Sequence, residues 1–484
     1  MKSESSVLVV DLDGTLIKTD LLLECFLKYL KAKPFLFWLP FFWLFTGGKV
    51  GLKRKLSDRV KIDYSSLPYC NAVLKKIREA KADNNKIVLA TASYVTLADG
   101  VAAHLKLFDE VYSTEDVNLS SSNKANCLIE AFDDRPFAYI GNSSADLAVW
   151  AKAHQAYVVN ADTSLIRKAK TINANTEVLA PKPSHVWQWI KAIRPHQWAK
   201  NMLVFLPILA AQQIGFNTST LNVLIGFLSF SLCASSVYLL NDLLDVEDDR
   251  HHHKKNRRPF AAGTLGLGVG LFSFPILLST SAVLAFIVSP EFLGVLVVYW
   301  LITTAYSFQL KKVVLLDVFT LAILYTMRIF AGTVAANVLP SDWLFAFSIF
   351  LFLSLAILKR YSELIAKREV NQNEKIRGRG YHPEDLEMLS SLGGASGYVA
   401  ALVLALYISS EKVQLMYSHP EFLWGANLVV LYWNSRIWLL AHRGKVHDDP
   451  VVYALKDKVS RYTVFVAGIF VLLAAYGEQI YAFG

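Results

Sequence analysis

The stretch Asn241–Pro259, with the sequence NDLLDVEDDRHHHKKNRRP, holds five acidic residues and five Lys or Arg residues between two long apolar segments. Apolar runs of about 17 to 25 residues, the length that a helix needs to cross a bilayer, recur from Leu203 onward. A solvated loop between two such spans needs only a few polar residues. The charge density therefore indicates that this loop binds a ligand or an ion at the membrane surface.

The composition divides the chain into parts of two kinds. Its 484 residues are 54% hydrophobic and 13% aromatic, which is more apolar than an average globular protein. Up to about residue 185 the pattern is that of a soluble α/β protein. We predict a multidomain chain, with an α/β Rossmann-like domain and its helical cap at residues 1–180, a linker and interfacial helix at 181–201, and an all-α membrane domain of nine transmembrane helices at 202–484.

Basic residues predict how the spans are oriented. The nine predicted spans cover residues 202–216, 221–241, 265–288, 291–308, 314–337, 343–358, 395–410, 421–441 and 461–482. The loops after the even-numbered spans carry most of the Lys and Arg residues of this part, which places these loops in the cytoplasm. The N-terminus lacks the apolar segment of a secretory signal. We therefore expect a multi-pass protein of the cell inner (plasma) membrane, with its first domain in the cytoplasm and its C-terminus outside.

The charge balance and the cysteines exclude other classes. The net charge of +9 could suggest a nucleic-acid partner, but the basic residues of the second half cluster at span ends, which is a topological pattern. The four cysteines form no CxxC pair, so we expect reduced thiols, and we expect neither a zinc site nor a disulfide framework.

The segment between the two domains has the composition of a helix that lies on the membrane surface. It mixes Trp187, Trp189 and Trp198 with Lys191 and Arg194.

The segment SVLVVDLDGTL, residues 6–16, is an apolar strand followed by Asp11 and Asp13. Two carboxylates two residues apart at a strand end can act differently, one as a nucleophile on phosphorus and the other as a general acid and base. Mg²⁺ would neutralise the phosphate and hold it in line.

Three further segments follow in order. Thr91 ends a second apolar strand, Lys124 follows as a cation for a phosphoryl group, and Asn142 and Asp146 follow a third strand. This order resembles the haloacid dehalogenase-like phosphatase superfamily over about residues 6–175. The resemblance implies the following roles: nucleophile, Asp11; acid and base, Asp13; phosphate binding, Thr91 and Lys124; and Mg²⁺ site, Asp11, Asp13, Asn142 and Asp146. Asn142 stands where the family has an acidic ligand, so Asp146 is expected to carry more of the metal site, with a lower affinity for Mg²⁺.

An insertion at about residues 16–85 contains the apolar segment KPFLFWLPFFWLF, residues 33–45. This segment is too short and too interrupted by proline to span a bilayer comfortably. The resemblance implies that the insertion forms a cap over the active site. Two interpretations remain open, one in which the segment is the buried core of the cap, and one in which it dips into the bilayer and admits a lipid substrate.

Asp242, Asp245 and Asp249 fall at positions i, i+3 and i+7, which predicts that they line one face of a helix at the cytoplasmic end of a span. Adjacent carboxylates repel one another unless cations lie between them, and Mg²⁺ with a pyrophosphate would fill this place. Asn241 can add a neutral oxygen. The alternative is a solvated loop, but acidic residues at a membrane edge are costly and usually functional.

The pattern NDxxDxxxDR, followed by basic residues and RPFAAG, resembles the first aspartate-rich motif of the UbiA-type intramembrane prenyltransferase superfamily, from about residue 185 to the end. The segments RPHQWAKN, AYSFQLKK, KRYSEL and YWNSRIWLLAHRGKVHDDPVVYALKDKVS resemble its decaprenyl-phosphate phosphoribosyltransferase branch. This resemblance implies Mg²⁺-dependent transfer of 5-phosphoribose from phosphoribosyl pyrophosphate to a polyprenyl phosphate. The second aspartate-rich motif of the superfamily, DxxxD, is missing, and Lys359, Arg360, Tyr361 and Glu363 stand in its place.

Cations in place of carboxylates suit a site that meets three anionic groups. The residues expected to bind substrate are Lys200, Asn241, Arg250, Arg258, Tyr306, Lys311, Lys359, Arg360 and Tyr361. The residues expected to catalyse by holding Mg²⁺ are Asp242, Asp245 and Asp249, and Glu363 is a further metal ligand. Lys311 and Lys312 fit membrane anchoring equally well, and Asp448, Asp449 and Asp457 could contribute to the same cleft.

The fusion suggests that the phosphatase removes the 5-phosphate from the lipid product, giving polyprenyl-phosphoryl ribose. One alternative is an aromatic prenyltransferase with a polyprenyl diphosphate donor and an independent phosphatase domain. Another is a transporter or anchor attached to an active phosphatase. The sequence leaves the oligomeric state open, a homo-oligomer included.

Overall fold

The computed structural model describes residues 7–133, 135–182, 184–213, 215, 217–368, 380–446 and 449–481. The chain forms two compact units. Unit 1 comprises Met1–Arg194 with Tyr238–Ile276, and unit 2 comprises Pro195–Val237 with Leu277–Gly484. The expected boundary near residue 201 differs from this division, because the loop with the aspartate-rich motif belongs to the same compact unit as the N-terminal domain.

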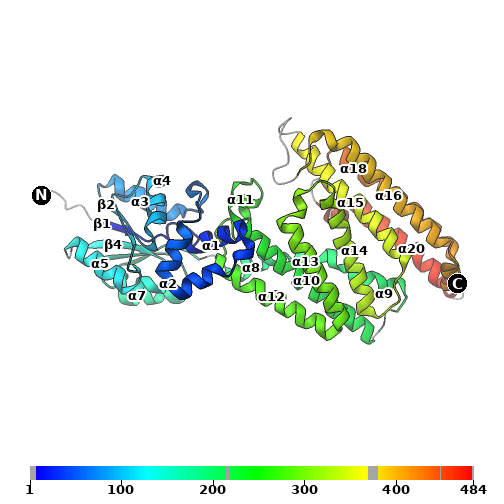
Figure 1. The fold of residues 1–484 in the computed structure, drawn as a ribbon, viewed down its shortest axis with the longest axis horizontal. Helices are drawn as coiled ribbons and strands as arrows, with labels where there is room; N and C mark the ends of the chain where they lie inside the picture. The colour runs from blue at the N-terminus through cyan, green and yellow to red at the C-terminus, as the bar shows by residue number, and fades with distance from the viewer. Residues whose placement is uncertain are drawn as a thin grey trace. The chain divides into compact units, whose positions relative to one another are not determined.

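A six-stranded parallel sheet forms the centre of unit 1, with the strand order β3-β2-β1-β4-β5-β6 (Figure 1). The strands are β1 (Val7–Val10), β2 (Lys86–Tyr94), β3 (Glu110–Thr114), β4 (Phe137–Gly141), β5 (Gln155–Ala161) and β6 (Thr176–Pro181). The strand order reverses beside β1, which pairs with β2 on one side and with β4 on the other. The carboxyl end of a sheet at such a reversal is where α/β proteins bind ligands. The predicted α/β Rossmann-like class is confirmed.

Helices cover both faces of the sheet, because successive side chains of a strand point to opposite sides. Leu8 and Val10 pack into one buried cluster and Val7 and Val9 into the other. The first face is covered by α1 (Leu21–Ala32), α2 (Leu39–Ser57), α3 (Asn71–Ala82) and α4 (Val95–Leu105). The second face is covered by α5 (Ser122–Phe132), α6 (Leu147–Trp150) and α7 (Thr163–Ile172). β1, buried on both faces, is therefore apolar at every position.

The expected cap segment is exposed rather than buried. It forms η1 (Pro34–Leu36) and the first half of α2, and α2 is interrupted at Gly48, which has a φ of 59°. Phe35 and Phe45 are 87% and 92% exposed. The interpretation as the buried core of a cap is therefore wrong for most of this segment, because only Pro40 and Trp43 are buried, with Leu36 and Leu39 packed partly against the core.

Unit 2 is helical. In the described part of the chain, seven helices are long and apolar enough to cross a membrane. They are α10 (Thr218–Leu244), α12 (Leu267–Val288), α13 (Pro290–Phe308), α14 (Leu316–Ala336), α15 (Asp342–Arg368), α16 (Leu386–Ile408) and α20 (Lys458–Tyr481). α10 and α12 each contribute residues to both units. The chain is thus a multi-pass membrane protein.

Seven of the nine predicted spans coincide with these helices. Within the first predicted span, residues 202–210 form the end of η4 (Pro195–Phe205) and the short helix α9 (Leu206–Ala210), with Pro207 near its start. Residues 421–441 do form a 20-residue helix, α18 (Leu423–His442), but it is not apolar enough to count as a span. Buried Asn427 and Asn434 lie within it.

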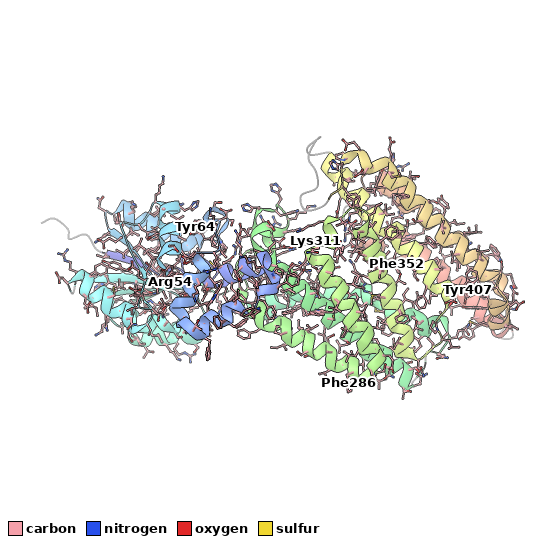
Figure 2. The ribbon with its side chains drawn as sticks, in the orientation of Figure 1. Arg54, Tyr64, Phe286, Lys311, Phe352 and Tyr407 are labelled. Atoms are coloured by element: carbon pink, nitrogen blue, oxygen red, sulfur yellow. The ribbon has the colours of Figure 1, made fainter. Side chains whose placement is uncertain are left out.

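Apolar side chains of unit 2 face both inward and outward, as expected of helices in lipid. Phe286 of α12 is 63% exposed and points away from its neighbours (Figure 2). Inside, Ser229 and Ser281 exchange hydrogen bonds between α10 and α12. Gly332 of α14 lies directly against the backbone of Val204 in η4. Small residues at such contacts let helical backbones approach closely.

Gly332→Ala should destabilise unit 2, because a Cβ atom at this position would lie 2.0 Å from the carbonyl oxygen of Val204. Overpacking of a filled interior costs about 1 to 3 kcal/mol. A backbone oxygen, unlike a side chain, cannot relieve the clash by changing its rotamer. Thermal unfolding of the full chain in detergent measures the effect, and we expect a lower Tm. Gly294→Ala in α13 is the matched control, because a Cβ atom there meets nothing within 4 Å. Equal Tm values for the two variants would contradict this packing.

Candidate functional sites

The loop after β1 holds the first carboxylate of the N-terminal site. Asp11 is buried, and its Oδ1 atom accepts a hydrogen bond of 2.7 Å from the Nζ atom of Lys124 at the start of α5. Its Oδ2 atom accepts a hydrogen bond of 3.1 Å from the hydroxyl of Thr15. Burial raises the pKa of Asp11 to about 6, although Lys124 lowers it. Lys124 therefore supplies the positive charge that a phosphoryl group beside Asp11 would need.

Asp13 lies in a different environment from Asp11. Its Oδ2 atom accepts a hydrogen bond from the hydroxyl of Ser93, and its Oδ1 atom accepts one of 2.9 Å from the amide of Leu21, the first residue of α1. Burial and the nearby carboxylate of Asp20 raise the pKa of Asp13 to about 7. A carboxyl group that is partly protonated near neutral pH can give a proton to a leaving group and take one back.

The loop after β4 brings Asp146 and Asn142 to the same edge of the sheet. The Oδ1 atom of Asp146 accepts a hydrogen bond of 2.7 Å from the hydroxyl of Tyr139, which in turn accepts one of 3.0 Å from Lys124. Its Oδ2 atom accepts hydrogen bonds from the amides of Asn142 and Ser143. Both oxygens of Asp146 therefore hold the loop and orient Lys124.

Asn142 lies against the loop that carries Asp11 and Asp13. A Cβ atom added at Gly14, which has a φ of 75°, would lie 2.1 Å from the Nδ2 atom of Asn142. Only glycine fits under this amide. The carboxylates of Asp11, Asp13 and Asp146 and the amide oxygen of Asn142 are all oxygen donors of the kind that suits Mg²⁺.

Thr91 lies in β2 and is buried. Its hydroxyl accepts a hydrogen bond of 3.0 Å from the amide of Ser93. Thr91 thus helps to hold the end of β2, from which Ser93 donates to Asp13. The structure brings together the predicted residues Asp11, Asp13, Thr91, Lys124, Asn142 and Asp146, which come from four separate segments of the chain.

The aspartate-rich motif forms a second site in unit 1. The helix is interrupted at Asp245, where α10 ends and α11 (Val246–His251) begins, so the expected single helix is not continuous. The hydrogen bonds from the amide of Asp245 to Asn241 and from the amide of Asp249 to Asp245 still keep the helical spacing. Asp242 and Asp249 are 3% and 2% exposed.

One arginine joins these two buried carboxylates. The Nη1 atom of Arg258 lies 3.0 Å from Asp242 Oδ1 and 2.6 Å from Asp249 Oδ2. Arg194, at the end of α8 (His185–Ile193), also donates to both oxygens of Asp242. Burial raises the pKa of Asp249, although Arg258 lowers it. Two carboxylates that converge on one positive atom fit a divalent cation, so the chemistry of this pair suits Mg²⁺.

Asp245 has a different partner. Its carboxylate lies 2.7 Å from the Nζ atom of Lys31 in α1, which also lies 2.6 Å from Asp248. Among the described residues, no group of three or more His, Cys, Asp or Glu side chains is arranged to hold a metal ion. The three predicted carboxylates are therefore not gathered around one point in this structure.

α1 contacts α11 through further ion pairs. Lys28 lies 2.6 Å from Glu247, and Arg250 lies 2.6 Å from Glu24, with both of the latter side chains buried. Arg250, predicted to bind substrate, is thus held in an ion pair that joins the N-terminal domain to the motif. The first residue of the same helix contacts Asp13, so α1 reaches from the N-terminal site to the aspartate-rich motif.

Two lysines of unit 2 share one carboxylate oxygen. The Oδ2 atom of Asp449 lies 2.9 Å from Lys200 Nζ and 2.8 Å from Lys359 Nζ. Lys200 comes from η4, Lys359 from α15, and Asp449 caps α19 (Pro450–Lys456). Although burial alone would raise the pKa of Asp449, Lys359 and Lys200 hold it well below its usual range. An excess positive charge remains beside this oxygen.

Arg360, next to Lys359, is fully buried in a closed network. Its guanidinium contacts Asp317 of α14, Glu363 one turn along α15 and the hydroxyl of Tyr306. Tyr381 also donates to Asp317. The predicted substrate and metal ligands Arg360, Tyr306 and Glu363 thus bind one another in this structure.

The remaining predicted residues lie outside this network. The hydroxyl of Tyr361 lies 3.0 Å from the ring of His442. Lys311 lies in the short helix η6 (Leu310–Lys312) (Figure 2). Asp457 pairs with Arg436 over 2.7 Å, and Asp448 lies outside the described residues.

Sequence reasoning missed several polar residues of these sites. Ser93 and Tyr139 lie within apolar strands, where a hydroxyl in a buried position was the signal available. Asp317 and Arg328 are charged residues inside an apolar span, which by itself indicates a functional or paired group. Arg328 donates to Asn201 and to Tyr299 in the interior of unit 2.

Comparisons with known proteins match both parts of the chain to different extents. The profile of the UbiA prenyltransferase family matches residues 202–456. The uncharacterized protein y4nM of Sinorhizobium fredii is 36% identical over 96% of this chain and 90% of its own length. The decaprenyl-phosphate phosphoribosyltransferase of Mycolicibacterium smegmatis is 37% identical over 59% of this chain and 91% of its own length. A solved UbiA homolog from Archaeoglobus fulgidus, bound to GPP and Mg²⁺, aligns with 59% of this chain and 99% of its own, with a TM-score of 0.46 and 14% identity.

Glu24→Ala should loosen the contact between α1 and α11, because it leaves Arg250 as an unpaired charge. The two side chains are 5% and 6% exposed, and removal of one partner of a buried ion pair costs about 3 to 5 kcal/mol. Hydrogen exchange of the full chain measures the effect, and we expect faster exchange in both helices. Glu79→Ala removes one partner of an exposed pair in α3, which is worth less than about 1 kcal/mol. Unchanged exchange in the Glu24 variant would show that the pair does not stabilise this contact.

Proposed function

Because the chain belongs to the UbiA prenyltransferase family, we propose that its membrane domain transfers 5-phosphoribose from phosphoribosyl pyrophosphate to a polyprenyl phosphate and releases pyrophosphate. The similarity to the decaprenyl-phosphate phosphoribosyltransferase of Mycolicibacterium smegmatis supports this choice within the family. The absence of a DxxxD motif beside Lys359 supports it too, because a donor and an acceptor that both carry phosphate need cations.

The observation that carries the proposal is the arrangement of Lys200, Lys359 and Asp449. Two ammonium groups lie within 2.9 Å of a single carboxylate oxygen. A phosphate oxygen of a substrate offers the same charge and the same hydrogen-bond acceptor as this carboxylate oxygen. Lys200 and Lys359 would therefore bind a phosphate group of the lipid acceptor or of the donor, with Asp449 keeping both lysines in place.

Asp242 and Asp249 would hold Mg²⁺, with Asp245 joining them when Lys31 moves away. When bound, the ion would neutralise charge on the departing pyrophosphate. In the reaction, the bond between the anomeric carbon and the pyrophosphate oxygen breaks, and its electron pair leaves with that oxygen. An oxygen of the polyprenyl phosphate then forms the new bond to the anomeric carbon. Arg194 and Arg258, which already contact Asp242, would stabilise the negative charge of the leaving group.

We propose that the N-terminal domain is a phosphatase that removes the 5-phosphate of this lipid product. Asp11 would attack phosphorus while Asp13 gives a proton to the departing ribose oxygen. Water would then cleave the phosphoryl group from Asp11, with Asp13 taking a proton from it. Lys124 balances the charge on the phosphoryl oxygens. Mg²⁺, held by Asp11, Asp13, Asn142 and Asp146, would supply further charge neutralisation. A phosphatase tethered to the transferase raises the effective concentration of its substrate.

The basic loops support a location of both sites on the cytoplasmic side of the inner membrane. Phosphoribosyl pyrophosphate is a water-soluble donor, so it would reach the aspartate-rich motif from that side.

Asp245→Asn should lower lipid product formation on the order of 100-fold, since one charged ligand of the proposed Mg²⁺ site is lost. The assay incubates the full chain in proteoliposomes with labelled phosphoribosyl pyrophosphate and a polyprenyl phosphate, and mass spectrometry identifies the lipid. Asp248→Asn is the matched control, because Asp248 pairs with the same Lys31 over 2.6 Å but lies outside the predicted triad. Full activity of the Asp245 variant would overturn this role. Product from a polyprenyl diphosphate and an aromatic acceptor instead would overturn the proposed donor.

Asp11→Asn should abolish release of inorganic phosphate, by more than about 1,000-fold, because the nucleophile of the proposed phosphatase is lost. Transfer should continue, so the lipid product should keep its 5-phosphate in the mass spectrum. Asp83→Asn, at an exposed position after α3, should release phosphate at the rate of the unmodified chain. If the Asp11 variant releases as much phosphate as the unmodified chain, the N-terminal site is not the phosphatase.

A further inference from the structure

Large apolar side chains lie exposed on the segment that joins α1 to the middle of α2. We call this set the aromatic patch, and its members are Phe35, Phe37, Trp38, Phe41, Phe42, Leu44 and Phe45. Their exposed fractions run from 42% for Leu44 to 92% for Phe45. Large exposed apolar patches mark interaction sites, so this group of seven side chains indicates a surface with a partner.

The segment is folded although its apolar side chains are exposed. Trp43 is buried, and its ring packs 5.4 Å from that of Tyr29 in α1. The guanidinium of Arg59 also lies over the indole of Trp43, 4.9 Å from the ring centre. Phe41 meets Phe26 edge to face at 6.1 Å. These contacts fix the backbone, so the aromatic patch is a defined surface.

Charge on either side of the aromatic patch is of one sign. Residues 33–57 contain five Lys or Arg residues and neither Asp nor Glu. Lys33 precedes the patch, and Lys49, Arg54 and Lys55 follow it in the second half of α2 (Figure 2 shows Arg54). An apolar face flanked by cations is the composition of helices that lie in the interface of an anionic bilayer.

We propose that the aromatic patch inserts into the headgroup and upper acyl layer of an anionic lipid bilayer. The same chain has seven candidate spans, which attach it to a bilayer. The apolar part of α2 ends at Gly47 and Gly48, where added Cβ atoms would meet nothing within 4 Å. About nine residues of helix are too few to cross the hydrocarbon core, so the segment enters one leaflet only.

The second half of α2 connects the aromatic patch to the N-terminal site. The Nζ atom of Lys53 donates to the carbonyl oxygen of Ala92 and, over 2.7 Å, to Asn118. Ala92 lies between Thr91 and Ser93, the residues that contact each other beside Asp13. Insertion of the aromatic patch would therefore place the end of β2, which borders this site, close to the bilayer surface. A phosphate group carried by a lipid could then enter the site. This last step rests on the proposed phosphatase, whereas the insertion itself does not.

Depth-dependent fluorescence quenching tests the insertion. The full chain carries Phe45→Cys labelled with bimane, in a Cys127→Ser background that removes the one native cysteine that is not buried. Nanodiscs of phosphatidylglycerol and phosphatidylcholine contain lipids with a doxyl quencher on the acyl chain. Val464→Cys, on the exposed side of α20 at 71% exposure, is the lipid-facing reference. Lys75→Cys, with a side chain 79% exposed on α3, is the water-facing control.

We expect the label at Phe45 to lose fluorescence to a similar extent as the label at Val464, and the label at Lys75 to lose none. Phe35→Cys, at 87% exposure, repeats the measurement if the Phe45 variant fails to fold. Labels at both positions that stay bright while Val464 is quenched would overturn the proposal, and so would shielding of both labels by a second copy of the chain. Quenching that persists in the Asp11→Asn background would separate insertion from phosphatase activity.

Discussion

Every buried carboxylate of this protein that the candidate sites use needs a positive charge or a donor hydrogen beside it, because desolvation of an unpaired charge is costly. The ion pairs that meet this need are Asp11–Lys124, Glu24–Arg250, Asp242–Arg194, Asp249–Arg258, Asp317–Arg360 and Asp449–Lys359. They join segments far apart in the sequence. The same pairs therefore hold the fold together and gather the groups that would bind phosphate and Mg²⁺.

The pairs differ in how open they are to a ligand. Arg360 and Asp317 are completely buried, with further partners on both sides, so they act as a closed structural bond. Lys359 and Arg258 are 28% exposed in their side chains, and each belongs to a group of three or more charges. A phosphate or a divalent cation that enters can take the place of one partner without leaving the other unpaired. We therefore expect the partly exposed ion pairs to take part in ligand binding, and the fully buried pairs to stabilise the fold.

Sequence reasoning predicted the parallel α/β domain, the helical membrane domain and the grouping of Asp11, Asp13, Lys124 and Asp146, because strand periodicity and short motifs are local signals. Seven of its nine predicted spans coincide with candidate helices in the described part of the chain, and hydropathy alone does not show that the helix at Pro207 has only five residues. Sequence reasoning also did not predict which cation forms an ion pair with which carboxylate. The pairing of Arg250 with Glu24 depends on two segments that are adjacent only after folding, and the roles of the site residues stay predictions.

The helix α1 makes the aspartate-rich loop depend on the N-terminal domain. Removing residues 1–180 would strip Glu24 from Arg250, and Lys28 and Lys31 from the acidic side chains of α11. The aspartate-rich loop would then carry the guanidinium of Arg250 without its carboxylate partner. The acidic side chains of α11 would lose the lysines that balance their charge. A shortened protein that keeps only the transferase part would therefore need compensating substitutions at the loop residues that had contacted α1 before the loop could keep its native conformation.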